Sequence, residues 1–204
     1  MDERGTWTNT THDWSTVVDR EHLQLIRDHA DVMAPTGVRH LILEVVAYAN
    51  DEAEALGRRG HCRVTSHPDG LISVADDGRG TDTRRDEHGR IVRKPVMATK
   101  DLRFFDRVAA TLPDGGTRRG MSVVAALSTW LEHTNHRTDG AWTQRYEHGI
   151  PAADLVEVPV SVNTGTTVRF RPDPRYVAPA VVEPTLFARF AWLTVTTPTG
   201  RGHN

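Results

Sequence analysis

The chain has 204 residues and a formal net charge of −2, from 25 Lys and Arg against 27 Asp and Glu. Hydrophobic residues make up 38% of it, an ordinary globular composition that excludes collagen-like, coiled-coil and transmembrane classes. The balanced charge argues against direct nucleic-acid binding, which needs a basic excess. A single cysteine, Cys62, excludes an internal disulfide and a Cys-rich zinc site. We expect a cytoplasmic protein without membrane contact, composed of an arm at 1–19, one domain at 20–195 and a tail at 196–204.

Apolar spacing predicts helices in the first part of the domain. A short helix is expected over 20–33, because the Ala-Pro-Thr-Gly turn at 34–37 ends it. The strongest helical periodicity runs from Val38 to Gly57, with apolar residues three and four positions apart. Short helical pieces are expected over 95–110.

The rest of the chain is predicted to be mainly strands joined by turns. Alternating residues at 61–66 and an apolar stretch at 71–75 indicate a hairpin. A Gly-rich loop at 112–120 precedes a helix expected at 121–131, and a last helix is expected at 184–193. The other predicted strands are 131–137, 141–148, 155–162 and 166–171. Helices followed by antiparallel hairpins indicate an α+β two-layer sandwich.

The chemistry-bearing motifs occur in a characteristic order. Asp76-Asp77-Gly78-Arg79-Gly80 follows a strand, and on its own it marks only a turn. A His40-x-x-x-Glu44 pair lies upstream on a helix, and the loop at 115–120 and a Thr164-Gly165-Thr166 turn lie downstream. This order resembles the GHKL (Bergerat-fold) ATPases, most closely the ATP-binding domain of gyrase B and topoisomerase IV.

The resemblance covers about residues 23–193. Its blocks include the stretches 44–53, 72–80, 122–128 and 164–173. It implies a mixed sheet with helices on one face, and a nucleotide held between the helices and a lid loop. ATP is the ligand that it implies.

The resemblance assigns roles at the adenine end of the site. Asp76 matches the carboxylate that accepts the adenine amino group, and a charged acceptor would fix the orientation of the base. The matched glycines would let the backbone approach the ligand, the Thr would support the adenine contact, and the arginines would line the pocket rim. The positions concerned are Gly78, Gly80, Thr166, Arg79 and Arg137.

A second set of residues matches the hydrolytic end. Glu44 matches the general base that activates water, and His40 lies one helical turn before it on the same face. A His–Glu pair in a cleft can tune a carboxylate for proton transfer.

Two features depart from the family pattern. Tyr48 stands where the family has the Asn that binds Mg²⁺, and a phenol is a poor ligand for this ion. Asn50 cannot replace that Asn, because it lies about 240° round the helix from Glu44. The adjacent family Asp is Ala47. We therefore expect no metal ligand here, and we expect Tyr48 to block the metal position beside Glu44.

The second departure is the lid loop, which reads Gly-Gly-Thr-Arg-Arg-Gly at 115–120. In the family this loop gives its backbone N–H groups to the phosphates. Here Arg118 and Arg119, with Gly120, allow three interpretations: the arginines bind phosphate, plug the site, or are solvated.

Two functional hypotheses follow. The first is a stand-alone gyrase-B-like domain that binds ATP or another planar ligand with weak or absent hydrolysis, in a regulatory, decoy or inhibitor-resistance role. The second is a repurposed metal-free enzyme of natural-product biosynthesis that uses Glu44, His40 and Tyr48 for acid–base chemistry. The partner hypotheses are a small-molecule or nucleotide ligand, a homodimer, and association with gyrase.

Overall fold

The computed structural model describes residues 18–80, 84–85, 91–92, 110–153 and 155–198. The helices are α2 (Arg20–Asp28), α3 (Ala30–Met33), α4 (Val38–Ala55), α5 (Met121–Ala126) and α6 (Pro184–Phe187). The strands of the main sheet are β1 (Gly60–Ser66), β2 (Ile72–Asp76), β5 (Ser128–Arg137), β6 (Gly140–Glu147), β7 (Ile150–Pro151), β8 (Val156–Glu157), β9 (Gly165–Pro172) and β10 (Leu193–Thr196). A separate pair consists of β3 (Arg84–Arg85) and β4 (Ile91–Val92).

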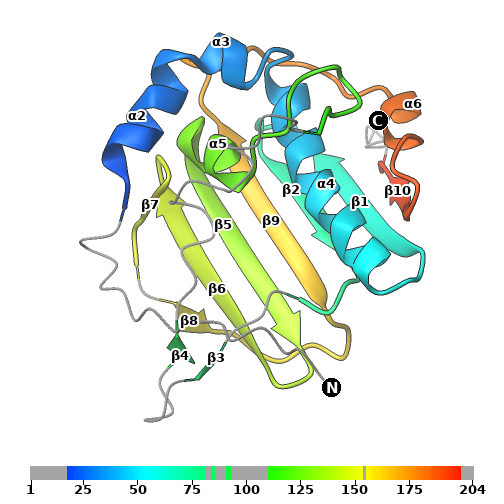
Figure 1. The fold of residues 1–204 in the computed structure, drawn as a ribbon. Helices are drawn as coiled ribbons and strands as arrows, with labels where there is room; N and C mark the ends of the chain where they lie inside the picture. The colour runs from blue at the N-terminus through cyan, green and yellow to red at the C-terminus, as the bar shows by residue number, and fades with distance from the viewer. Residues whose placement is uncertain (1–17, 81–83, 86–90, 93–109, 154, 199–204) are drawn as a thin grey trace, which may run out of the picture.

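The sheet is mixed, and in the described part of the chain it has eight strands. Its order is β10-β1-β2-β9-β5-β6-β7, with β8 also paired to β6. The pairing is antiparallel throughout, except that β1 and β10 run parallel. Figure 1 shows α4 and α5 packed across the same face of this sheet. The predicted α+β sandwich with helices on one face is confirmed.

Several predicted boundaries at the helices were wrong. The helix expected over 20–33 is interrupted at His29, whose φ of −121° is not helical. The helix expected over 121–131 ends at Ala126, and β5 begins two residues later. A short apolar run fits a buried helix and a buried strand equally well, and here pairing with β6 and β9 selects the strand.

The predictions near the end of the chain also needed correction. Only Val156–Glu157 of the strand expected over 155–162 is formed. The last helix ends at Phe187, and Leu193–Thr196 forms β10, which we did not expect. Four residues carry too little periodicity to predict a strand, so β10 is defined by its pairing with β1. The helical pieces expected over 95–109 and the arm at 1–17 lie outside the described residues.

Helix α4 forms the centre of the core and carries the most unusual burial. Its apolar residues Leu41, Ile42 and Leu43 are almost fully buried, as expected for a helix packed on a sheet. His40 and Glu44 are buried equally completely, although ionisable side chains are rarely buried unless they are paired. The partners of these two residues therefore identify the region to search for a site.

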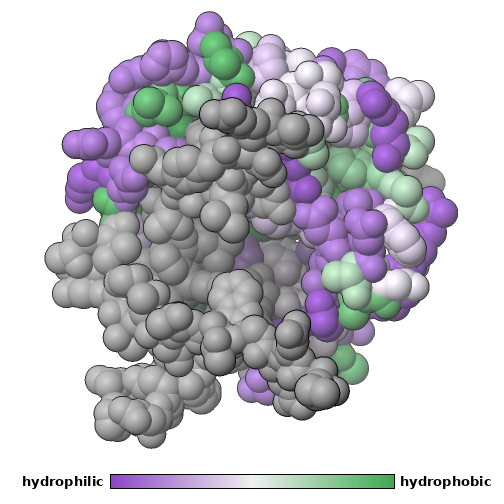
Figure 2. All heavy atoms as spheres, in the orientation of Figure 1, coloured by the Kyte–Doolittle hydropathy of each residue, from purple (hydrophilic) through white to green (hydrophobic). Residues whose placement is uncertain are grey.

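The surface differs from this core. The part formed by α2 and α3 is mostly hydrophilic with a few apolar spots (Figure 2), and Leu25 and Val32 are its exposed large apolar side chains. Across the described residues, no helix combines the length and apolarity that a membrane span requires.

A test of the fold concerns Gly165, where β9 starts beside the end of β2. Its φ is +148°, and a Cβ there would lie 2.0 Å from the carbonyl oxygen of Asp76. We expect Gly165→Ala to lower the free energy of unfolding by more than about 1 kcal/mol, measured by urea denaturation. Gly70→Ala is the control, because Gly70 also has a positive φ (+85°) but no atom within 4 Å of its Cβ position. Equal effects of the two changes would show that the close approach to Asp76 contributes nothing.

Candidate functional site

Asp76 ends β2 and is the centre of the predicted adenine end. Its Oδ1 accepts hydrogen bonds from the backbone N–H of Gly78 (2.9 Å) and of Thr166 (3.2 Å). Burial raises the pKa of this carboxyl to about 6, although these two hydrogen bonds oppose the shift. Both bonds involve Oδ1, so Oδ2 is the atom left to accept a proton from a ligand. The structure thus brings together three residues that the sequence assigned to one contact.

Arg79 lies at the same end, bound to a carboxylate of α4. Its Nε and Nη2 donate to Glu52 at 2.7 and 3.1 Å, and these hydrogen bonds hold the pKa of Glu52 below its usual range. Gly78 makes this approach possible, because a Cβ there would lie 2.7 Å from Cγ of Glu52. Arg79 is therefore an ion-pair partner of α4 in this structure.

Gly80 and Arg137 also lie close together. Arg137 donates to the carbonyl of Gly80 at 3.2 Å. Gly80 has a φ of +78°, and a Cβ there would lie 2.5 Å from Oδ1 of Asn135. The glycine thus allows the loop after β2 to contact β5.

His40 forms the middle of a fully buried polar group at the other end of α4. Its Nδ1 lies 2.9 Å from Oδ2 of Asp114, and its Nε2 lies 3.5 Å from Oε1 of Glu44. Burial opposes charge on the imidazole, but the two carboxylates outweigh it and raise the pKa of His40 to about 9. Burial likewise would raise the pKa of Asp114, but hydrogen bonds from His40 and Thr36 lower it to about 2. His40 is therefore an imidazolium at neutral pH.

Glu44 is held by the lid loop. Its Oε1 and Oε2 accept the backbone N–H groups of Arg119 and Gly120 at 2.5 and 3.1 Å. With His40 beside it, this carboxylate is enclosed by donors on α4 and on the loop. In the resemblance these loop N–H groups belong to phosphate, so the chain's own general-base candidate occupies their acceptor position.

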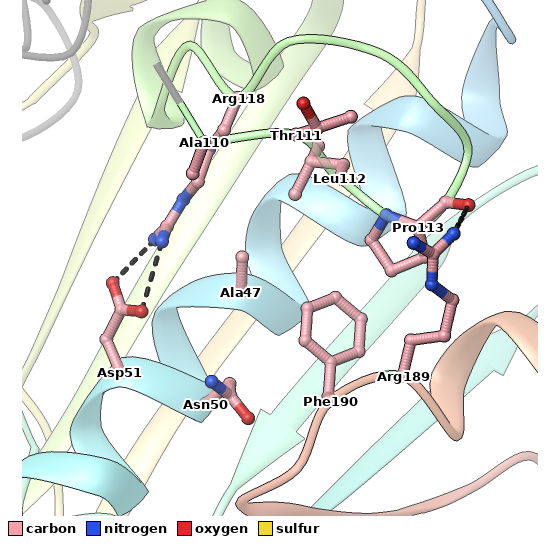
Figure 3. A pocket seen from close by; sticks show the side chains of 10 residues that line it. All are labelled: Ala47, Asn50, Asp51, Ala110, Thr111, Leu112, Pro113, Arg118, Arg189 and Phe190. Atoms are coloured by element: carbon pink, nitrogen blue, oxygen red, sulfur yellow. Dashed lines mark hydrogen bonds and ion pairs between the residues drawn. The ribbon is translucent and has the colours of Figure 1, made fainter. Parts of the chain in front are cut away.

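Arg118 reaches from the loop back to α4 (Figure 3). Its two terminal nitrogens bind the carboxylate of Asp51 at 2.7 and 3.0 Å, a bidentate geometry. Its guanidinium carbon lies 4.9 Å from the ring centre of Tyr48, within the range of a cation–π contact. Arg118 is only 8% exposed, so the interpretation as a solvated side chain was wrong.

These contacts decide how well the region suits Mg²⁺. A cation already lies over Tyr48, and the second carboxylate that could serve the ion, Asp51, is bound to that cation. No group of three or more His, Cys, Asp or Glu suited to a metal occurs among the described residues. The residues at positions 47 and 48 lack the compact oxygen ligands that Mg²⁺ requires, so the donor set does not fit this ion.

A cavity of about 180 Å³ lies beside the Arg118–Asp51 pair. Figure 3 shows this pair on one side of the cavity and the hydrogen bond between Arg189 and Pro113 on the other. Its lining residues are Ala47, Asn50, Asp51, Ala110, Thr111, Leu112, Pro113, Arg118, Arg189 and Phe190. Asp76 is not among them, so this cavity is separate from the adenine end. The expectation that Asn50 turns away from Glu44 agrees with its hydrogen bond to the N–H of Trp192 (3.1 Å).

Sequence reasoning missed three carboxylates of the site as partners. Asp114 orients His40, Asp51 binds Arg118, and Glu52 binds Arg79. Asp51 and Glu52 lie inside a recognised motif block, but nothing local indicates their arginine partners. Asp114 precedes two glycines and could be predicted only as a turn residue.

The order of Asp76, the lid loop and the buried His–Glu pair on this mixed sheet defines a GHKL-type domain with the Bergerat fold. The chain is homologous to the N-terminal region of the B subunits of DNA gyrase and DNA topoisomerase IV. It is 38% identical to DNA gyrase B of Thermotoga maritima over 68% of the chain and 22% of that relative. It is 36% identical to DNA topoisomerase 4 B of Staphylococcus epidermidis over 67% and 21%.

A third relative, DNA gyrase B of Treponema pallidum, is 31% identical over 78% of the chain and 26% of its own length. The chain thus spans about a quarter or less of the length of these relatives. No protein-family model matches it.

The charged His40 provides a test of the buried group. Because the folded-state pKa is about 9 and the usual value is about 6.5, the stabilisation is complete below pH 6.5 and is lost as the pH rises through 9. We expect the free energy of unfolding to fall by roughly 1–3 kcal/mol between pH 7 and pH 9.5, measured by urea denaturation. Asp114→Asn, which removes one of the two carboxylates, should flatten this dependence. An identical slope in both proteins would contradict the assigned charge.

Proposed function

We propose that this domain binds a planar, adenine-type ligand through Asp76 and hydrolyses ATP at a negligible rate. The observation that carries the proposal is the contrast between the two ends of α4. At one end Asp76 has a buried carboxylate with Oδ2 left for a ligand. At the other end Glu44 is saturated by the loop N–H groups and His40. Homology to gyrase B supports a nucleotide-type ligand.

The hydrolytic half lacks what a general base needs. A base must reach the proton that it abstracts, directly or through one water. The side chain of Glu44 is 0% exposed, and both oxygens accept hydrogen bonds from the chain itself. Binding without turnover suits a regulator, a gyrase decoy or an inhibitor-resistance protein, and these are the biological roles that we propose.

The second hypothesis, a metal-free enzyme, has one observation in its favour. The Asp114–His40–Glu44 group links an imidazolium to two carboxylates, which is the arrangement of an acid–base relay. However, the side chains of all three residues are 0% exposed, so a substrate would reach them only after the loop moved. Binding is therefore the function that the geometry supports better.

Hydrolysis is tested by a steady-state phosphate-release assay with Mg²⁺ and ATP. We expect release indistinguishable from the protein-free blank, because Glu44 is enclosed and the residues at 47 and 48 do not suit Mg²⁺. A gyrase B ATP-binding domain assayed in parallel is the positive control. Turnover comparable to that control, and lost in Glu44→Gln, would refute the proposal.

Ligand anchoring is tested at Asp76 by calorimetry with adenosine. Asp76→Asn removes a charged acceptor, so adenosine binding should weaken by roughly 1.5–3 kcal/mol, about 10- to 100-fold. Asp77→Asn is the matched control, since Asp77 is the neighbouring carboxylate but binds His61 and Arg58 at the surface.

The same assay has an expected pH dependence. Because the pKa of Asp76 is about 6, the carboxylate is protonated as the pH falls from 7 to 5, and adenosine affinity should fall with it. Equal affinity in Asp76→Asn and wild type, or no change with pH, would show that Asp76 is not the anchor.

A further inference from the structure

The groups that a phosphate would need along α4 are already bound to carboxylates of the chain. Phosphate is bound in proteins by backbone N–H groups and by guanidinium groups. The N–H groups of Arg119 and Gly120 hold Glu44. The guanidinium of Arg118 holds Asp51 through both terminal nitrogens.

The order of these contacts along the helix matters. Glu52 marks the adenine end, since it lies against Gly78 and Arg79. Asp51 and Tyr48 follow toward the N-terminus of α4, and Glu44 lies eight residues from Glu52, about 12 Å at 1.5 Å per residue. A ligand that is anchored at Asp76 and extends along α4 would thus reach the Arg118–Asp51 pair, then Tyr48, then Glu44.

A polyphosphate chain following this path meets a cost at each step. It must displace Asp51 from a guanidinium that is nine-tenths buried and lies over Tyr48. Beyond that it must displace Glu44 from two N–H groups and leave this carboxylate buried with fewer donors. Removing one partner from a buried charge is far more costly than removing an exposed contact. No such cost applies to a ligand that ends at the ribose.

We propose that the domain selects an unphosphorylated adenine-type ligand, such as a nucleoside or a neutral planar heterocycle, and discriminates against its di- and triphosphates. This inference rests on the proposed function, because it requires a ligand at Asp76. Glu44 and Asp51 are the residues that set the discrimination, acting as internal substitutes for phosphate. Arg118 and Tyr48 fill the space between them.

The test is an affinity series of adenosine, AMP, ADP and ATP, measured by calorimetry in EDTA and again in excess Mg²⁺. We expect adenosine to bind most tightly, ADP and ATP to bind at least tenfold more weakly, and Mg²⁺ to restore none of the loss. If ATP binds tenfold more tightly than adenosine, the selectivity is wrong while the proposed binding function stands. If no member of the series binds, both are wrong.

A variant tests the cause of the selectivity. Tyr48→Asn combined with Arg118→Gly removes the ring and the guanidinium and leaves Asp51 without its cation partner. We expect a tenfold or greater gain in ATP affinity in Mg²⁺, with adenosine affinity changed by less than about twofold.

Arg169→Ala is the charge-matched control, because Arg169 is exposed on the sheet face opposite the buried Val168 and Phe170 of β9. A gain of the same size in Arg169→Ala would assign the effect to overall charge and overturn the role of Arg118 and Tyr48. If the double variant does not fold, the wild-type series decides alone.

Discussion

The hydrogen bonds between Glu44 and the loop N–H groups of Arg119 and Gly120 determine how the rest of the site is arranged. They fix the loop against α4, and this position places Arg118 over Tyr48 and brings Asp114 to His40. A carboxylate buried in this way is stable only if its donors are complete. Each of these residues therefore depends on the others, and the site is a single connected polar network.

The two ends of α4 have correspondingly different chemistry. Near Glu52 the loop after β2 leaves one oxygen of Asp76 for a ligand. Near Glu44 the polar groups are satisfied internally. In homologues that bind phosphate, the same positions would have to remain available. This domain has kept the fold and the anchoring carboxylate, while substitutions at 47, 48, 118 and 119 have changed what the other end can accept.

The sequence predicted the site unevenly, for a physical reason. Asp76, Gly78 and Thr166 belong to short motifs whose local turns bring their backbone to one point, so spacing alone predicted their meeting. Asp114 lies 74 residues from His40, and this contact depends on where the loop packs in three dimensions. The same applies to β10, whose four residues become a strand only by pairing with β1. Apolar periodicity predicted α4 and the β1–β2 hairpin, but not where α5 gives way to β5.

The Arg118–Asp51 pair differs from the Glu44 contacts in its access to water. The Asp51 side chain is 41% exposed, whereas that of Glu44 is 0% exposed. Dissolved ions screen charges over about 8 Å at physiological ionic strength and reach exposed pairs far more than buried ones. Added salt should therefore loosen the arginine while leaving the buried carboxylate in place. The loop has one attachment that responds to the ionic environment of the protein and one that does not.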